Sequence, residues 1–234
     1  MNKPYNPIVP SHRPSNPSPL ELAIHRYEVL AAKHYNMMLA QKNNADEKVK
    51  IQMEQDKAHL KRLRHSLSAQ VLLQSSLTEY REECSKKSVS ELRQEPHHPT
   101  TVLARNLTAI GEPKPSQKHD PHHIIMGAGR FRKARMMSAR LNMHMHGIGI
   151  NDPINGVWLP RTKDDEGHWA TPEAPAHKKI HRYNYETWIS VQLAGETLPE
   201  QVFRNRLRNI KNQLKNSSYP ENVVAPKDLK WKGQ

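Results

Sequence analysis

The sequence predicts a mostly helical α+β protein in which a helical hairpin precedes a domain of short strands and helices. Two observations lead to this fold class. Apolar residues recur every three or four positions over most of residues 19–95, which is the period of amphipathic helices. After a proline-rich stretch, two short apolar runs that are typical of strands flank a basic helical segment.

The charge of the chain favours a polyanion as its partner. Lys and Arg outnumber Asp and Glu by 36 to 23, which gives a net charge of +13. Up to residue 95 there are 15 basic and 11 acidic residues, and from residue 96 onward there are 21 and 12. A basic surface that only keeps a protein dispersed would have the same net charge as a nucleic-acid-binding one. The distribution predicts that DNA, the expected partner, binds the second half of the chain.

The cysteine count and hydropathy limit the classes of protein further. Cys84 is the single cysteine, which excludes an intramolecular disulfide and a cysteine-based zinc site. Residues 1–19 are polar, and no apolar run approaches the ~18 residues of a membrane span. We therefore expect no secretory signal and no membrane partner, and a protein made in the cytoplasm. If it leaves the cell, a dedicated secretion machine exports it.

The N-terminal part is expected to be an arm followed by two helices. Residues 1–18 contain five prolines and predict a disordered or extended arm. Ser18, Pro19 and Glu21 then form a capping signal that begins a helix, which we expect to end near Asn43 and Asn44. Its predicted buried face contains Leu20, Ile24, Tyr27, Ala31, Tyr35 and Met38.

A second long helix follows with a similar apolar series, consisting of Val49, Met53, Leu60, Leu63, Leu67 and Val71. Two such helices predict an antiparallel hairpin over residues 19–95, which is either a docking module or a structural brace. Prolines and weak periodicity then predict a linker over residues 96–120 and a second domain over 121–234. The closing helix of that domain has a predicted buried stripe of Phe203, Leu207, Ile210 and Leu214.

Two histidines begin the second domain. His122 and His123 directly precede Ile124 and Ile125, in a run that predicts a strand. Because neighbours on a strand point to opposite sides, two functional histidines here would have different roles. The pair alone is a weak signal, since the chain has 15 histidines and a second pair, at residues 97 and 98, falls in the predicted linker.

Two further elements follow along the chain. Asn155 and Gly156 predict a turn before a second strand, which would pair with the first around a basic helix that either contacts phosphates or is merely solvated. His177 and His181 follow Pro175 at a spacing of four, and the same helical period continues through Tyr185, Trp188 and Ile189. Two imidazoles on one helical face can bind one metal ion, and two surface histidines beside a helix start are the alternative.

Taken in order, these residues resemble the Ala-His-His toxin nucleases of the HNH and endonuclease VII superfamily, whose site is a ββα-metal (His-Me) finger. The resemblance covers about Pro121 to Leu193. One departure is Pro121, where the family has alanine, and we expect this change to alter the entry into the strand more than the chemistry. The matching residues are His122-His123-Ile124-Ile125, Gly149-Ile150-Asn151-Asp152, Asn155-Gly156-Val157-Trp158-Leu159-Pro160, and His177, His181 and Tyr185.

The resemblance implies a role for each of these positions. His122, His177 and His181 would hold one divalent metal ion, which could be Mg, Mn, Zn or Ni, and His168 is a rival ligand. His123 would be the general base, and Asn155 would fix the loop that orients it. The expected nucleic-acid contacts are Arg135, Arg140, Lys178 and Arg182.

The implied activity is metal-dependent hydrolysis of DNA with little sequence specificity, because contacts to phosphates do not read bases. The resemblance further suggests an antibacterial toxin effector, exported by a type VI or other contact-dependent system and active in the cytoplasm of the target cell. A cognate immunity protein would neutralise it in the producer, and residues 19–95 would dock on the secretion apparatus. Two other functions stay open, a non-catalytic basic nucleic-acid-binding protein and a ribonuclease of the same fold.

Overall fold

A computed structural model of the chain describes residues 7–40 and 46–234. The chain divides into two compact units between Leu73 and Gln74. This boundary lies inside a helix and upstream of the domain boundary predicted near residue 96. Within the described ranges, no helix is long and apolar enough to cross a membrane.

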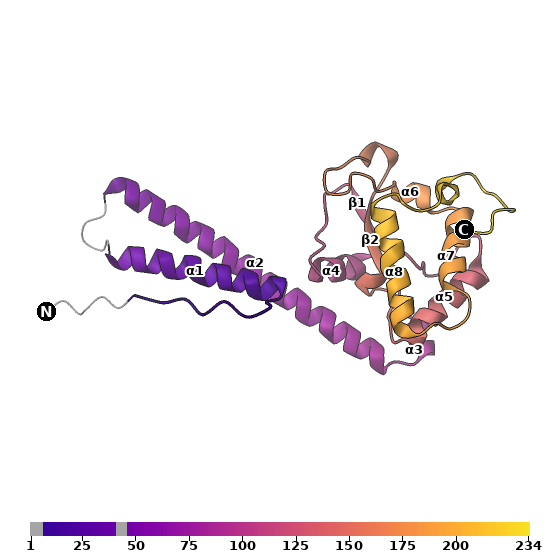
Figure 1. Ribbon diagram of the computed structural model, residues 1–234, viewed down its shortest axis with the longest axis horizontal. Coiled ribbons are helices and arrows are strands. Elements are labelled where there is room, and N and C mark those ends of the chain that lie inside the picture. Colours follow the sequence, from indigo (N-terminus) through magenta and orange to yellow (C-terminus); the bar gives the residue numbers. More distant parts are fainter. Residues whose placement is uncertain (1–6, 41–45) are drawn as a thin grey trace. The chain divides into compact units, whose positions relative to one another are not determined.

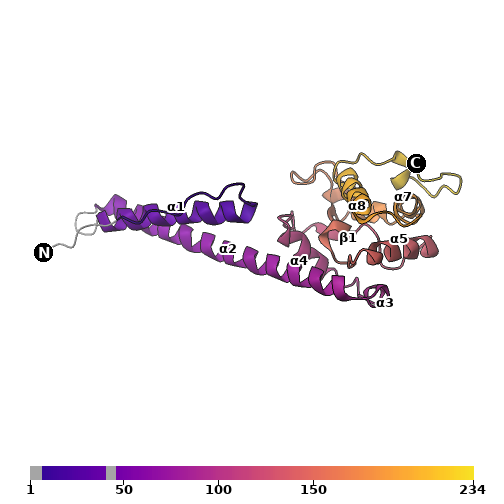
Figure 2. The same ribbon diagram turned by 60° about the horizontal axis from the view of Figure 1, so that its bottom comes forward.

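The first unit contains α1 (Pro19–Ala40) and the beginning of α2 (Glu47–Lys86), which lie side by side in Figures 1 and 2. Ser18 and Glu21 form the predicted capping box through reciprocal bonds between side chain and backbone, of 2.8 and 3.2 Å. The predicted apolar face of α1 is only partly covered, since Ile24, Tyr27 and Ala31 are half-buried while Tyr35 and Met38 are exposed. The expected helix end at residues 43 and 44 lies outside the described residues.

The described part of the predicted arm lies against α1. Residues 7–18 form no helix or strand, but Ile8 exchanges two hydrogen bonds with the Asn36 side chain. The Ile8 amide donates to Asn36 Oδ1 over 2.8 Å, and Asn36 Nδ2 donates to the Ile8 carbonyl over 2.9 Å. The described part of the arm is therefore attached to α1 at Ile8.

The second unit is built around a pair of antiparallel strands, β1 (His119–His123) and β2 (Gly156–Pro160). His119 pairs with Pro160 and His123 pairs with Gly156, so the predicted strand pairing is confirmed, and the mostly helical α+β class with it. Ile124 and Ile125 follow β1 as fully buried residues. The other elements are α3 (Val89–Arg93), α4 (Thr101–Ala109), α5 (Lys133–Met145), η1 (Pro153–Asn155), η2 (Lys163–Asp165), α6 (His177–Ile180), α7 (Tyr183–Leu193), α8 (Glu200–Lys215) and η3 (Glu221–Val224).

Helices cover both sides of the strand pair. α4 contacts both strands and α8 contacts β2, and Figure 1 shows these two helices on opposite sides of the strand pair. The main core joins Ile124 and Ile125 to apolar residues of α5, α7 and α8. The stripe predicted for the closing helix is buried at all four of its positions, because α8 turns this face toward the core.

The stretch 96–120 is not irregular throughout, which corrects the expectation of a linker. It contains α4, whose Leu103 and Leu107 are fully buried against Trp158 of β2. The Trp158 indole also donates a hydrogen bond to the carbonyl of Glu112 over 2.9 Å. A helix of nine residues between prolines gives too short a window for its apolar period to stand out.

His144 of α5 is buried in the neutral form. Its Nδ1 donates to the Ile148 carbonyl over 2.9 Å, and its Nε2 accepts from Arg140 Nε over 3.0 Å. Burial lowers the pKa of His144 below its ordinary value of 6.5. A second ring proton, on Nε2, would point at the Arg140 guanidinium, which has only donors and cannot accept it.

We predict that the free energy of unfolding falls as the pH drops below about 6.5, and that His144 contributes to this fall. The pKa of His144 is lower in the folded state, so the unfolded chain binds more protons in this window and stability rises with pH. The contribution is at most about 1.4 kcal/mol per pH unit for one proton. Urea unfolding of the metal-free protein at pH 7.5 and 5.5 should show a smaller loss for His144→Gln. Equal losses would contradict the prediction.

Candidate active site

The last two residues of β1 point to opposite sides, as the strand pattern predicted. The His122 ring lies 5.0 Å from that of His177 and 5.3 Å from that of His181, measured between ring centroids. The His123 ring lies on the other side, 6.3 Å from that of His97. Strand geometry has therefore given the two neighbours different surroundings.

Three histidines converge on one point. Ring nitrogens of His122, His177 and His181 lie within 4.8 Å of one another, and the Nε2 atoms of His177 and His181 are 2.8 Å apart. Among the described residues, this is the group of side chains that could hold a metal ion. The rival ligand His168 packs instead against His119, with 4.9 Å between ring centroids.

The hydrogen bonds of Tyr185 fix which nitrogen of His122 carries the proton. The Tyr185 hydroxyl donates to the Ile124 carbonyl over 2.9 Å, so it accepts from His122 Nε2, also at 2.9 Å. Nε2 is therefore the protonated nitrogen of the neutral ring, and Nδ1 has the free lone pair. A hydrogen bond that sets the tautomer of a ligand in this way is typical of histidines that bind metals.

Burial keeps the three imidazoles neutral. It lowers the pKa of His177 to about 4 and that of His122 well below the ordinary range, and the neighbouring imidazoles add to both shifts. The pKa of His181 is lowered as well, mainly by burial. Metal ligands must be unprotonated, so three converging neutral imidazoles fit a divalent metal ion.

The carboxylate of Asp120 lies near His177, on the side of the ring away from His181. Asp120 Oδ2 lies 3.6 Å from His177 Nδ1, the nitrogen that faces away from His181, and two nitrogens of Arg161 bond the same carboxylate at 3.0 and 3.2 Å. The separation between Asp120 and His177 is longer than a hydrogen bond. Asp120 and His122 are two residues apart on β1, which places both on the side of the strand that faces His177.

The helix predicted to run from His177 through Tyr185 is interrupted, which corrects the expectation of a continuous period. α6 ends at Ile180, His181 leaves the helical conformation at ψ 65°, and α7 begins at Tyr183. Two short helices instead of one allow the Tyr185 hydroxyl to reach both His122 and Ile124.

Asn151 orients His123. The carboxamide oxygen of Asn151 lies 3.0 Å from His123 Nε2, while its Nδ2 donates to Glu95 Oε1 over 2.7 Å and to the Pro96 carbonyl over 3.1 Å. Two oxygen acceptors at Nδ2 leave Oδ1 to face the imidazole, so His123 donates from Nε2. The neutral ring then has its free lone pair on Nδ1. Burial lowers the pKa of His123 to about 4, which keeps the ring neutral at pH 7.

Asn155 was expected to fix the loop that orients His123, and its side chain bonds the backbone and not the imidazole. Its Oδ1 accepts from the Ile125 amide over 2.8 Å, and its Nδ2 donates to the carbonyls of Ile125 and Ile150 over 3.1 and 3.0 Å. It therefore ties the end of β1 to the segment that contains Asn151. Asn155 is a positioning residue, and the side chain that bonds His123 belongs to Asn151.

A cavity of about 240 Å³ opens over both sides of the site. His97 and His98, which the sequence places in the predicted linker, line it together with both histidines of β1. Gly127 leaves room for the His97 ring, because a Cβ there would overlap it. A larger cavity of about 700 Å³ elsewhere in the second unit is lined by none of the three converging histidines. The lining of the smaller cavity is His97, His98, Thr100, Pro121, His122, His123, Met126, Gly127, Ala128, Gly129, Arg130, His177 and His181.

The predicted nucleic-acid contacts separate into exposed and buried residues. Arg140 is 4% exposed and donates to the carbonyls of Arg93, Glu95 and Gly127, so it is unavailable to a phosphate, contrary to the prediction. Arg135 is exposed and borders a different cavity. Lys178 is exposed and Arg182 half-buried, and they directly follow His177 and His181 in sequence.

Comparison with known proteins gives one match. A family model described as a nuclease family of the HNH/ENDO VII superfamily with conserved AHH matches residues 103–224. No curated protein and no solved structure matches the chain.

We predict that His177→Ala loses metal binding while His123→Ala keeps it. Removing one of three converging nitrogens should weaken metal binding by more than about 100-fold, since even residues that only hydrogen-bond the ligands change metal affinity by 10–100-fold. The measurement is Zn²⁺, Ni²⁺ and Mn²⁺ content after equilibrium dialysis. Wild-type metal content in His177→Ala, or its loss in His123→Ala, would show that the ligands are assigned wrongly.

Proposed function

Because the chain belongs to the AHH nuclease family of the HNH/ENDO VII superfamily, we propose that it is a metal-dependent DNA endonuclease with little sequence specificity. The observation that supports this most directly is the pair of tautomers on β1. His122 has Nδ1 free and lies in one cluster with two other neutral imidazoles, while His123 is held separately with its own nitrogen free. A metal site and an oriented base thus adjoin one cavity.

His123 is the proposed general base. Its unprotonated Nδ1 takes a proton from a water molecule that attacks the phosphodiester, while Asn151 holds Nε2–H and keeps the ring from turning. The lowered pKa keeps His123 ready to accept this proton down to mildly acidic pH. A divalent cation bound by the three histidines would supply positive charge that stabilises the departing oxyanion. Three imidazoles favour Zn or Ni, and Mg and Mn also stay within the proposal.

The proposed substrate contacts are electrostatic. The second half of the chain has nine more basic than acidic residues, 21 against 12. His98 and Arg130 line the cavity beside the ligands, and Lys178 and Arg182 flank them in sequence. Contacts of this kind bind phosphates irrespective of the bases, which is the reason to expect low sequence specificity.

We extend the proposal to an antibacterial toxin effector, delivered by a type VI or other contact-dependent system and neutralised by a cognate immunity protein. The support is the resemblance of residues 121–193 to toxin nucleases. Residues 19–95 are the proposed docking part for the secretion apparatus, and several apolar side chains there are exposed, including Leu30, Met38 and Leu72.

We predict that expression in a bacterial cytoplasm stops growth and degrades chromosomal DNA, and that His123→Ala abolishes both effects. The reason is that toxicity through DNA cleavage needs the base, whereas toxicity from misfolding or from binding nucleic acid does not. Growth curves and gels of total DNA, at matched protein levels, make the measurement. Equal growth arrest by His123→Ala would exclude toxicity by cleavage.

We predict that the purified protein cuts supercoiled plasmid in the presence of a divalent ion and that a chelator stops it. His123→Ala should lower the rate by at least about 100-fold, the usual contribution of a general base. Parallel digests of DNA and RNA decide between a deoxyribonuclease and a ribonuclease. Plasmid that stays intact with Mg²⁺, Mn²⁺, Zn²⁺ and Ni²⁺ would exclude the nuclease and favour a binding protein.

A further inference from the structure

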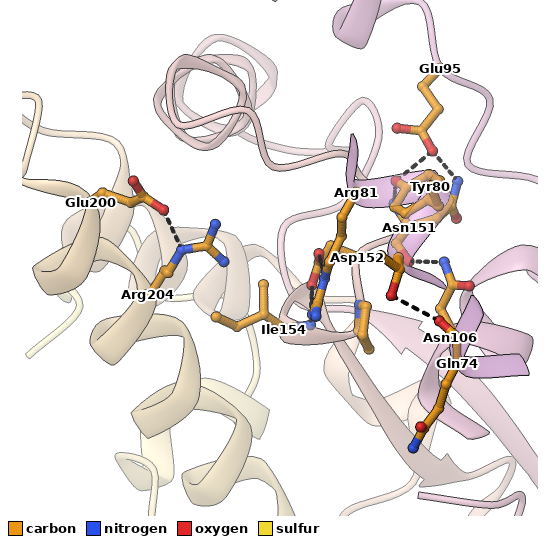
Figure 3. Close-up of polar contacts among 12 residues, drawn as sticks. Gln74, Tyr80, Arg81, Glu95, Asn106, Asn151, Asp152, Ile154, Glu200 and Arg204 are labelled. Carbon is orange, nitrogen blue, oxygen red and sulfur yellow. Dashed lines mark hydrogen bonds and ion pairs between the residues drawn. The ribbon is translucent and has the colours of Figure 1, made fainter. Parts of the chain in front are cut away.

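A carboxylate outside the matched segment bonds the side chain of Asn151, which contacts His123. Glu95 lies after α3, eight residues before the matched segment begins at residue 103. Its Oε1 accepts from Asn151 Nδ2 over 2.7 Å, and its Oε2 accepts from the Ile150 amide over 2.9 Å. Figure 3 shows Glu95 directed at Asn151 together with Tyr80.

Tyr80, near the end of α2, completes this contact. Its hydroxyl donates to Glu95 Oε1 over 2.8 Å and accepts from the backbone amide of Asn151 over 3.1 Å (Figure 3). The space is built for these two side chains, because a Cβ on Gly149 would overlap the Tyr80 hydroxyl and lie 2.8 Å from Glu95 Oε2. Residues upstream in the sequence therefore bond both the side chain and the backbone of Asn151.

The carboxylate of Glu95 favours one orientation of the Asn151 carboxamide. A carboxamide has an acceptor at one end and a donor at the other, and either end can face a neighbour. A carboxylate only accepts, so it selects the orientation in which the amide nitrogen faces Glu95 and the oxygen faces His123. The reverse orientation would bring two oxygens together and offer His123 a donor, which requires the other tautomer of the imidazole.

Building on the proposed nuclease activity, we propose that Glu95 and Tyr80 are positioning residues that hold His123 in the tautomer with its proton on Nε2. Through Asn151, they leave Nδ1 free to accept the proton of the attacking water. A flipped carboxamide would move the proton of the ring to Nδ1 and remove the base without removing the histidine. The functional nuclease unit therefore includes residues upstream of the matched segment.

The test uses Glu95→Gln in the full chain, with Glu83→Gln as the matched control. Glu83 is an exposed residue of α2 whose carboxylate lies 3.8 Å from Lys87. In Glu95→Gln, the new carboxamide can present either an oxygen or a nitrogen to Asn151 while the shape is kept. Only the Pro96 carbonyl then still selects the orientation of Asn151, so the selection is weakened. A quenched fluorescent duplex gives kcat and KM, and metal content is measured in parallel.

We predict that kcat of Glu95→Gln falls by about 10–100-fold, while KM and metal content stay within about twofold of wild type. Ring ¹⁵N NMR of the metal-free protein, with the His123 signals assigned from their absence in His123→Ala, should show one tautomer in wild type and a mixture in Glu95→Gln. Glu83→Gln should match wild type in every measurement. A single unchanged tautomer with wild-type kcat in Glu95→Gln would overturn the proposal.

A second variant covers the case in which Glu95→Gln does not fold, as judged by circular dichroism. Tyr80→Phe removes only the hydroxyl, and we expect it to shift the tautomer and kcat in the same direction by a smaller amount. Wild-type behaviour of Tyr80→Phe would then overturn the proposal. Failure of wild type to cut the duplex would count against the nuclease activity, whereas the NMR comparison still decides the role of Glu95.

Discussion

The site depends on two hydrogen bonds that decide which nitrogen of each β1 histidine carries a proton. The Tyr185 hydroxyl accepts a hydrogen bond from His122 Nε2–H, and the Asn151 carboxamide oxygen accepts one from His123 Nε2–H. A neutral imidazole has one donor and one acceptor, so each bond sets free the opposite nitrogen for chemistry. Burial supports the same arrangement, because it lowers the pKa of both rings and keeps them neutral. Without the two oxygen acceptors, nothing would determine which ring nitrogen of each histidine carries the proton.

The strand pair explains how two neighbouring residues can have such different partners. Alternation along β1 turns Asp120 and His122 toward His177, and His123 toward Asn151. Asn155 then fixes the end of the strand through the backbone of Ile125. One face of the strand thus provides the proposed metal ligand His122 and a carboxylate near His177, and the other provides the proposed base.

Patterns of short range predicted the strands, the opposite directions of His122 and His123, the capping box at Ser18 and the buried stripe of α8. These features follow from periods of two or of three to four residues, and from chemistry within one turn. The remaining features depend on pairs far apart in sequence. Glu95 and Asn151 are 56 residues apart, and no local signal connects them. His97 and His98 lie in the predicted linker, and no local signal indicates that they line the same cavity as His122 and His123. The helix that contains Tyr185 begins after the interruption, and its contacts are with Ile124 and His122, 61 and 63 positions upstream.

Arg140 shows most clearly why charge in a sequence does not identify a phosphate contact. Its guanidinium joins the backbone of Glu95, on one side of the site, to the carbonyl of Gly127, which lines the cavity. Burying a guanidinium costs several kcal/mol unless its donors are satisfied, and here carbonyl oxygens and His144 Nε2 accept from it. Lysine has one nitrogen and could not span these acceptors, which is the physical reason for arginine at this position. A positive charge that the sequence associates with DNA therefore holds in place the segment from which Glu95 reaches Asn151.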